Sequence, residues 1–385
     1  MRRSGTLHGL TIAIKDAVYT QGVRTTAGSR ILRNFVPDFD AFVVNEIKQN
    51  GGIMVGKTNL HEFCAGPTST SSAFGPTRNP NNPKLITGGS SGGSAGTVGM
   101  GDVEVAIGTD TGGSVRIPAA FCGVIGFKPT YGRISRYGVI PLAWSLDSVG
   151  IFARNVETLE LVYKLLAHYD SRDPTTIINE STHQDKSKIK TIGIIKELTQ
   201  DIEVEKEFSH FVNLMSRYFQ VTCISLPQIE SLAKARTIIR GAEMAAYHAT
   251  MVVKNSAKYS RDVLNMIKQG LSFNASDYVN AQRVRAQLGR EILQSFQKYD
   301  FLITPTVPVY PPRIDDVIGK EDKWRPVLNR NTFVVNMIGA PAISIPISKF
   351  VGAQLIGNIG DDHAIIDFVK KLSPEIPYFR ALNEN

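Results

Sequence analysis

Residues 107–118 read Ile-Gly-Thr-Asp-Thr-Gly-Gly-Ser-Val-Arg-Ile-Pro and place two adjacent glycines directly before Ser114. Because glycine has no side chain, the backbone of such a turn can approach a ligand closely and direct several N–H groups toward one point. An oxyanion hole for acyl transfer requires that arrangement. A glycine turn followed by a serine that caps a helix has the same pattern, and no general base lies beside Ser114 in the sequence. The segment alone therefore leaves a catalytic and a structural interpretation open.

Strands and helices are expected to alternate around this segment. Short apolar runs predict strands at Leu10–Ile14, Ile53–Val55, Val103–Ile107, Thr191–Ile195, Phe301–Ile303 and Ala342–Ile345. Apolar residues three and four positions apart predict helices at Val156–His168 and Lys206–Phe219. The alternation indicates an α/β fold with a largely parallel sheet, and the polar stretch Ser181–Lys188 is expected to be a loop. Of the 33 glycines, 24 lie within residues 1–150, where we therefore expect the site.

The composition excludes several classes of protein. Hydrophobic residues at 42% and charged residues at 20% are typical of a globular protein, and no apolar run reaches eighteen residues, so no membrane span is expected. Cys64, Cys122 and Cys223 are too few for a disulfide framework. The net charge is +8, but lysine and arginine are scattered, which favours a basic solvated surface over a nucleic-acid site. His61, Glu62 and Cys64 lack the partners of a metal motif and favour a capped helix with a buried thiol.

Two further glycine-rich motifs compete with the first. Gly51–Thr58 matches the phosphate-binding pattern GxxxxGK[ST]. A phosphate cradle needs exposed N–H groups on a loop between a strand and a helix, whereas Ile53–Val55 is predicted to be the strand itself and Phe42–Gln49 before it a helix. Asn59 with Glu62 then predicts a helix cap. We therefore expect no nucleotide site in this segment.

The segment Gly88–Ser94 contains GxSxG twice, centred on Ser90 and on Ser91. This is the nucleophile-elbow pattern of α/β-hydrolases, which requires an acid and a histidine later in the chain. His363 is the candidate histidine, and its alternative interpretation is a solvated loop residue. Because an elbow follows a strand directly, the proline- and asparagine-rich stretch Asn79–Thr87, predicted to be a loop, argues against this interpretation.

Three motifs together closely resemble the amidase-signature family, and they are Leu10–Asp16, Gly88–Ser94 and Thr109–Arg133. Their spacing agrees with the family as well, since Ser90 follows Lys15 by 75 residues and Ser114 follows Ser90 by 24. The resemblance implies an α/β fold with a mixed central β-sheet covered by helices on both faces. It also implies a single amidase domain over residues 1–385, with a glycine-rich catalytic core at 1–150 and a helical, substrate-covering part at 151–385.

The resemblance also assigns the chemistry, without a metal. Ser114 is the nucleophile, Ser90 follows a cis peptide bond and relays the proton, and Lys15 is the base. The oxyanion hole would be formed by the backbone N–H groups of Thr111, Gly112, Gly113 and Ser114. A lysine accepts a proton only when it is neutral, so burial has to lower its pKa. Alternation along the first predicted strand places Lys15 on the face of the smaller residues Thr11 and Ala13.

Within this family, Thr70–Pro80, Tyr131–Gly138 and Ser145–Ser148 resemble the branch of glutamyl-tRNA(Gln) amidotransferase A subunits. The branch implies a glutaminase that works through a glutamyl-enzyme ester, with no cofactor in this chain. Its ammonia would pass to a GatB-like subunit, which uses ATP and Mg²⁺ to convert Glu-tRNA(Gln) to Gln-tRNA(Gln) and makes most of the tRNA contacts. A small third subunit, GatC or GatF, is expected too. The basic charge and the weaker resemblance after residue 200 favour the mitochondrial matrix, with the bacterial cytoplasm as the alternative.

The substrate positions depart from the branch. Its glutamine-binding arginine should lie on the helix around Val263–Gly270, where this chain has Asn265 and Met266, and an acidic contact aligns with Asn329. Amide hydrolysis is therefore better supported than glutamine recognition. Two alternatives stay open, a stand-alone amidase that acts on another carboxamide and a non-catalytic scaffold that retains the signature.

Overall fold

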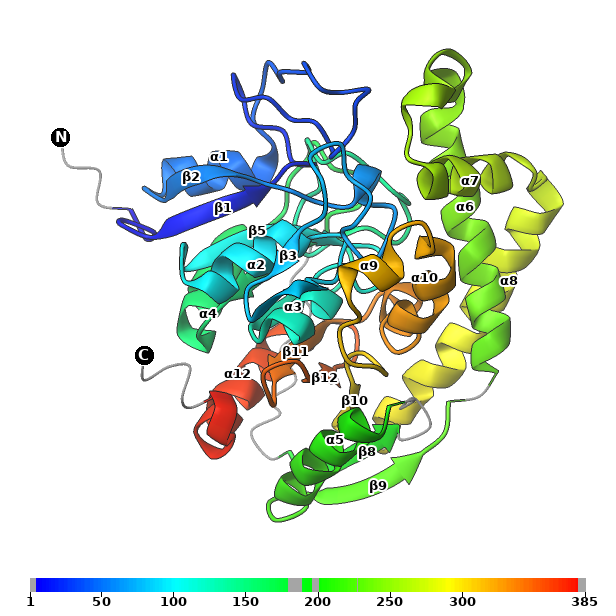
Figure 1. The fold of residues 1–385 in the computed structure, drawn as a ribbon. Coiled ribbons are helices and arrows are strands. Elements are labelled where there is room, and N and C mark those ends of the chain that lie inside the picture. The colour runs from blue at the N-terminus through cyan, green and yellow to red at the C-terminus, as the bar shows by residue number, and fades with distance from the viewer. Residues whose placement is uncertain (1–4, 179–188, 196–200, 227, 380–385) are drawn as a thin grey trace.

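A ten-stranded sheet forms the centre of the computed structural model, which describes residues 5–178, 189–195, 201–226 and 228–379 (Figure 1). In spatial order, its strands are β2 (Ile53–Thr58), β1 (Thr11–Lys15), β5 (Val105–Asp110), β7 (Ser148–Ala153), β6 (Ile125–Lys128), β11 (Ala342–Pro346), β12 (Gly352–Ile356), β10 (Phe301–Pro305), β8 (Thr191–Ile195) and β9 (Gln220–Ile224). The outer pairings β2–β1–β5 and β10–β8–β9 are parallel, whereas every pairing from β5 across to β10 is antiparallel. The sheet is therefore mixed, as the family resemblance implied, and the expectation of a largely parallel sheet was wrong.

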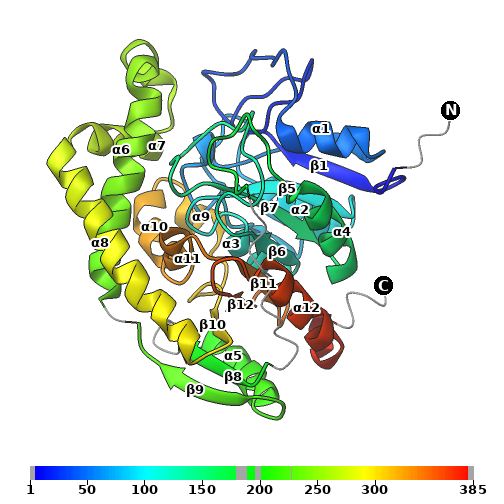
Figure 2. The ribbon, with the colours of Figure 1, turned by 180° about the vertical axis from the view of Figure 1, so that it is seen from behind.

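Helices cover both faces of this sheet (Figures 1 and 2). Successive strand residues point to opposite sides, and because the strands carry apolar side chains on both sides, both faces are buried against helices. Ile12 and Ile14 of β1 enter a core with α1 (Phe42–Gln49), α4 (Val156–Leu166), α5 (Ile202–Met215) and α12 (Asp362–Leu372). Ala13 points the other way and packs with α2 (Gly92–Met100) and α3 (Arg116–Cys122). Farther along that second face lie α6 (Ile229–Asn255), α8 (Ala275–Gln294) and α11 (Phe333–Ile338).

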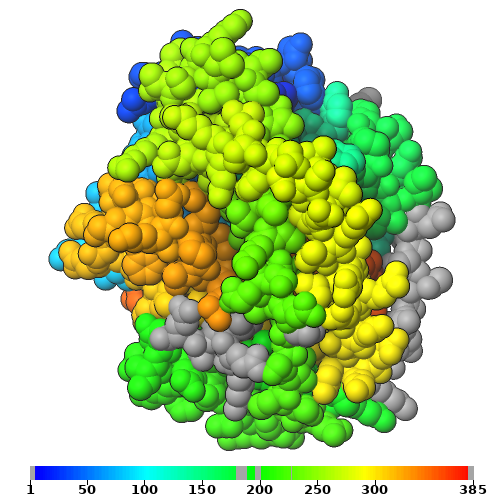
Figure 3. Space-filling view, turned by 90° about the vertical axis from the view of Figure 1, so that its right-hand side faces the viewer, coloured from blue at the N-terminus to red at the C-terminus, as the bar shows by residue number. Residues whose placement is uncertain are grey.

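The long helix α6 packs against both α8 and α7 (Arg261–Leu271). Figure 3 shows these three helices covering one side of the molecule, with the orange segment that holds α9 (Ile314–Val317) and α10 (Glu321–Asn329) beside them. In the described ranges, no helix combines the length and the apolar character that crossing a membrane requires.

The predicted helices and strands are present, with ends shifted by a few residues. The loop expected at Asn79–Thr87 is instead a short hairpin of β3 (Arg78–Asn79) and β4 (Asn82–Ile86). The buried side chain of Asn79 stabilises it by donating to the carbonyls of Ile86 and Phe121. The loop expected at Ser181–Lys188 lies outside the described residues.

The helix cap expected at Asn59 was wrong. The carboxamide oxygen of Asn59 accepts from the amide of Leu60 and the hydroxyl of Ser72, and the helix that follows is the single 3₁₀ turn Glu62–Cys64. Phe63 and Cys64 have positive φ angles of 48° and 61°, a region that disfavours continuation of a right-handed helix. The expected buried thiol of Cys64 is present, 3% exposed.

Candidate active site

Lys15 ends β1 on the face of the smaller residues, and it is completely buried. Its Nζ lies 2.8 Å from Ser90 Oγ, 2.8 Å from Ser91 Oγ and 2.7 Å from Thr109 Oγ1. Burial lowers the pKa of Lys15 below its usual value, against the opposing influence of Cys64 and of more distant carboxylates. The neutral amine that a general base needs is thereby favoured.

The surrounding hydroxyl groups assign a direction to these contacts. The Ser91 hydroxyl donates to the Thr109 carbonyl at 3.1 Å, and the Thr109 hydroxyl donates to the Cys64 sulfur at 3.6 Å. Both oxygens therefore accept from Lys15. A neutral amine has two N–H groups and one lone pair. With both N–H groups given to these two oxygens, the lone pair would be left for Ser90, whose Oγ lies 2.8 Å from Nζ. The hydroxyl proton of Ser90 can then pass to Lys15.

Ser90 is fixed by its backbone. The Gly89–Ser90 peptide bond is cis, as the resemblance implied. A Cβ atom at Gly89 would lie 2.7 Å from Ser69 Oγ and 2.9 Å from the Gly66 carbonyl oxygen, so only glycine fits there. The Ser90 carbonyl accepts from the hydroxyl of Ser69 at 3.2 Å and from the amide of His61 at 3.1 Å.

Ser114 lies in the turn between β5 and α3, where it is 7% exposed. Its carbonyl accepts from the Ser91 amide at 3.2 Å, which ties this turn to the segment that holds Ser90. The residue that caps α3 is Val115, so the alternative interpretation of Ser114 as a helix cap was wrong. Gly113 has φ of +125°, and a Cβ atom there would lie 2.1 Å from Thr332 Oγ1. This turn therefore needs glycine before the serine.

The predicted oxyanion hole is only partly available. The Gly113 amide donates to Asp110 Oδ1 at 2.8 Å, so this one of the four predicted donors is already engaged. The amides of Thr111, Gly112 and Ser114 make no hydrogen bond within the part of the chain that the structure describes, and they stay the predicted donors.

A buried ion pair holds the turn in place. Arg116 donates to Asp110 through Nε at 3.0 Å and through Nη2 at 2.8 Å, and both side chains are fully buried. Burial alone would raise the pKa of Asp110, but Arg116, with further help from Lys128 and the Val115 amide, holds it well below the usual range. Arg116 also donates to Gln354 at 2.6 Å. Asp110 therefore stays a carboxylate that orients the amides on either side of Ser114.

Ser114 borders a small cavity whose far wall comes from the later part of the chain. Its lining includes Arg236 and Arg240 of α6, Met266 of α7, and Arg325 and Asn329 of α10. Two of the three predicted substrate positions, Met266 and Asn329, thus lie at the cavity, whereas Asn265 is not part of its lining. The three arginines were not predicted from the sequence. Positions 236 and 240 lie one helical turn apart, which is common in any helix.

Lys57 and His363, on which the two competing interpretations depend, lie away from this site. Lys57 is inside β2, and its Nζ donates to Thr25 Oγ1 at 2.9 Å and lies 3.5 Å from Asp16 Oδ1. The interpretation of the P-loop match as a strand is confirmed. His363 belongs to α12, on the face of the sheet opposite Lys15, and its ring stacks edge-on against Tyr163 with centroids 5.1 Å apart. It supplies no base to Ser90.

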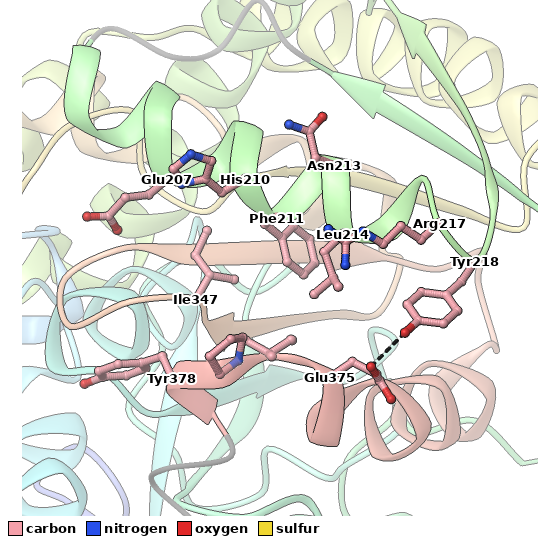
Figure 4. Close-up of a pocket in the computed structure, with 12 residues that line it drawn as sticks. Glu207, His210, Phe211, Asn213, Leu214, Arg217, Tyr218, Ile347, Glu375 and Tyr378 are labelled. Atoms are coloured by element: carbon pink, nitrogen blue, oxygen red, sulfur yellow. Dashed lines mark hydrogen bonds between the residues drawn. The ribbon is translucent and has the colours of Figure 1, made fainter.

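Two other features could suggest a site. His61 Nε2 lies 2.9 Å from Asp262 Oδ2, but no group of three potential metal ligands occurs in the described ranges. A larger cavity of about 680 Å³ opens between α5 and the segment around Tyr378 (Figure 4). Neither Lys15 nor the two serines contribute to its lining.

The model of the family described as Amidase matches residues 1–366. The chain belongs to the amidase family. This amidase is 34% identical to the A subunit of glutamyl-tRNA(Gln) amidotransferase from Archaeoglobus fulgidus, over 95% of its own length and 86% of the relative's. The corresponding A subunit from Thermotoga maritima, known from a crystal structure, is 32% identical, with a TM-score of 0.87 over 98% of this chain and 85% of that one. The allophanate hydrolase of Kluyveromyces lactis is also similar, with 29% identity and a TM-score of 0.88 over 96% of the amidase and 62% of the hydrolase.

Proposed function

We propose that this amidase hydrolyses a primary carboxamide through an ester on Ser114, and that it supplies ammonia as the A subunit of a glutamyl-tRNA(Gln) amidotransferase. The observation that carries the first part is the completely buried Lys15, whose Nζ lies 2.8 Å from Ser90 Oγ. The second part rests on relatives of that name, which are 33–37% identical over more than nine-tenths of the chain.

The proposed reaction uses three side chains of this chain, backbone amides of the Ser114 turn and one water molecule. Ser114 Oγ attacks the amide carbon while its proton passes to Ser90 and the Ser90 proton passes to Lys15. The negative charge that forms on the carbonyl oxygen is stabilised by the amides of Thr111, Gly112 and Ser114, and each donor lowers the barrier by about 3 kcal/mol. The C–N bond then breaks as the proton returns to the nitrogen, which leaves as ammonia. Water, activated by the same relay, hydrolyses the ester and regenerates Ser114.

In this proposal the ammonia passes to a GatB-like subunit, where ATP and Mg²⁺ activate Glu-tRNA(Gln). A small third subunit, GatC or GatF, completes the assembly, and this chain binds neither cofactor. In this proposal ammonia reaches the partner unprotonated, and its release is coupled to the presence of that partner. We therefore expect the isolated chain to be a weak glutaminase.

The test is ammonia release from glutamine by the chain alone and with a GatB-like partner, with Ser114→Ala as the control. Release that depends on Ser114 and rises with the partner supports both parts of the proposal. Full activity without a partner would favour a stand-alone amidase. Absence of amide hydrolysis under either condition would leave the scaffold as the better account.

A further inference from the structure

Two arginines in the wall of the Ser114 cavity have no anionic partner. Arg236 and Arg240 are 8% and 7% exposed, and neither makes an ion pair or a hydrogen bond with the residues that the structure describes. Their Nε atoms are buried without an acceptor. The Phe333 ring, 5.4 Å from the Arg236 guanidinium, is the one compensating contact that we find among the described residues.

The neighbouring acids are already engaged by other groups. Asp262 binds His61 at 2.9 Å and Arg325 at 3.2 Å, and Asp322 binds Arg325 at 2.5 Å. No aspartate or glutamate of the described ranges contributes to the lining of the cavity. An unpaired buried charge is costly, and two of them one helical turn apart repel each other as well. Such a pair is expected where a ligand supplies the missing negative charge.

The position of Arg236 defines where that charge would lie. A Cβ atom at Gly112 would be 2.6 Å from Arg236 Nη2, so the guanidinium rests directly on the backbone of a predicted oxyanion-hole residue. A substrate whose amide reaches Ser114 therefore brings its remaining atoms to the two guanidinium groups. Arginine presents its N–H groups in a planar fork that fits a carboxylate.

We propose that Arg236 and Arg240 bind the carboxylate of the substrate, and that the pocket recognises an anionic carboxamide without recognising an amino group. An α-ammonium would find no carboxylate among the described lining residues and would approach two fixed positive charges. The substrate class is the monoamide of a short dicarboxylic acid, and glutamine is accepted through its carboxylate alone. This inference rests on the proposed amide hydrolysis and specifies its substrate.

The test compares glutamine with glutaramate, which lacks only the α-amino group, and with the uncharged butyramide. The full chain is assayed together with its GatB-like partner, as wild type and as Arg236→Met, Arg240→Met and Lys254→Met, the last removing an exposed charge from the same helix. We expect kcat/KM for glutaramate to equal or exceed that for glutamine. Loss of either pocket arginine should lower both values by about 10- to 100-fold, while butyramide hydrolysis and the Lys254→Met variant change by less than about threefold.

Binding gives a readout that does not depend on catalysis. Calorimetry of Ser114→Ala with glutaramate should show saturable binding that Arg236→Met or Arg240→Met weakens by a similar factor. A preference for glutamine above about tenfold, or binding that both arginine variants retain, would overturn the inference while the amide hydrolysis stands. Equal loss of butyramide hydrolysis in the arginine variants would do the same. If glutaramate binds but no amide is cleaved, the proposed function fails and the carboxylate site stands.

Discussion

Lys15 Nζ lies 2.8 Å from Ser90 Oγ, although 75 residues separate them in the chain. The contact forms because β1 lies parallel to β5, and because α2 begins immediately after Ser90 and Ser91 on the face toward which Lys15 points. The same β5 leads into the turn that holds Ser114. One strand pair and one helix thus bring three distant motifs together, and burial at this place lowers the pKa of the lysine.

The first prediction is that kcat/KM rises with pH through the lowered pKa of Lys15 and then levels off. Its folded pKa is below the ordinary value, so deprotonation to the active form occurs at a lower pH than for a free lysine. Lys15→Ala and Lys15→Arg should each lose at least about 10²-fold, the contribution expected of a general base. Arginine keeps the charge but cannot accept a proton. A folded Lys15→Arg enzyme with substantial activity would exclude the base role.

The second prediction is that a fluorophosphonate labels Ser114. The proposed mechanism places the ester on Ser114, so mass spectrometry should locate the adduct on the peptide that contains it. Ser114→Ala should abolish labelling, whereas His363→Ala, on the opposite face of the sheet, should retain both labelling and activity. An adduct on Ser90 or Ser91 that disappears in His363→Ala would instead support the hydrolase-elbow interpretation.

The third prediction concerns Asp110, whose pKa is held below the usual range mainly by Arg116 against the effect of burial. Asp110→Asn leaves Arg116 buried without its counter-charge, which should cost about 3–5 kcal/mol of unfolding free energy. Urea unfolding at neutral pH measures this loss. Because the folded pKa is depressed, the stabilisation is complete above the unfolded value of about 3.9 and is lost as the pH falls through the folded value. The variant should lack this part of the acid dependence, and an equal acid slope in both proteins would contradict the assignment.

The sequence was sufficient to single out Lys15, Ser90 and Ser114, but not to predict the residues that line the cavity beside Ser114. Lys15, Ser90 and Ser114 carry local signals, namely strand alternation, glycine pairs and family spacing. The antiparallel centre of the sheet depends on pairings between strands that are far apart in the sequence. Strand β12 was not predicted, because the buried Gln354 interrupts its apolar run. That glutamine is accommodated because Arg116, far away in the sequence, donates to its carboxamide oxygen, and because its Nε2 donates to Thr304 and Asn331.

The burial of Arg236 and Arg240 could not be predicted from the sequence either, because it depends on contacts between distant segments. In the sequence they are two arginines on a helix, and polar helix positions usually face solvent. Their burial beside Ser114 results from the packing of α6 across the catalytic turn, which no local pattern encodes. Conversely, the P-loop match at Gly51–Thr58 forms the strand Ile53–Thr58 after its two leading glycines, because its apolar middle residues favour the sheet.

The fourth prediction follows from that strand. Lys57 is engaged by Thr25 and Asp16, and burial lowers its pKa to about 8 despite the nearby Asp16. Calorimetry of the chain with ATP and Mg²⁺ should therefore show no saturable heat. Micromolar binding that is abolished in Lys57→Ala would restore the nucleotide-site interpretation.

The fifth prediction is that Arg240→Met stabilises the free protein while it impairs turnover of anionic amides. Arg240 is buried without an ion pair among the described residues, and its pKa is lowered by burial first and then by the positive charges of Arg236 and Arg325. Replacement of such a charge by an apolar side chain of similar length should raise the free energy of unfolding by about 1–4 kcal/mol. Urea unfolding without ligand measures this gain, with Lys254→Met as the control that should change it by less than about 0.5 kcal/mol. Glutaramate should then stabilise the wild-type protein and leave Arg240→Met nearly unchanged, because a ligand stabilises only the state that binds it. A lower free energy of unfolding in Arg240→Met than in the wild type, together with stabilisation by glutaramate in both, would show that Arg240 stabilises the fold and does not bind a carboxylate.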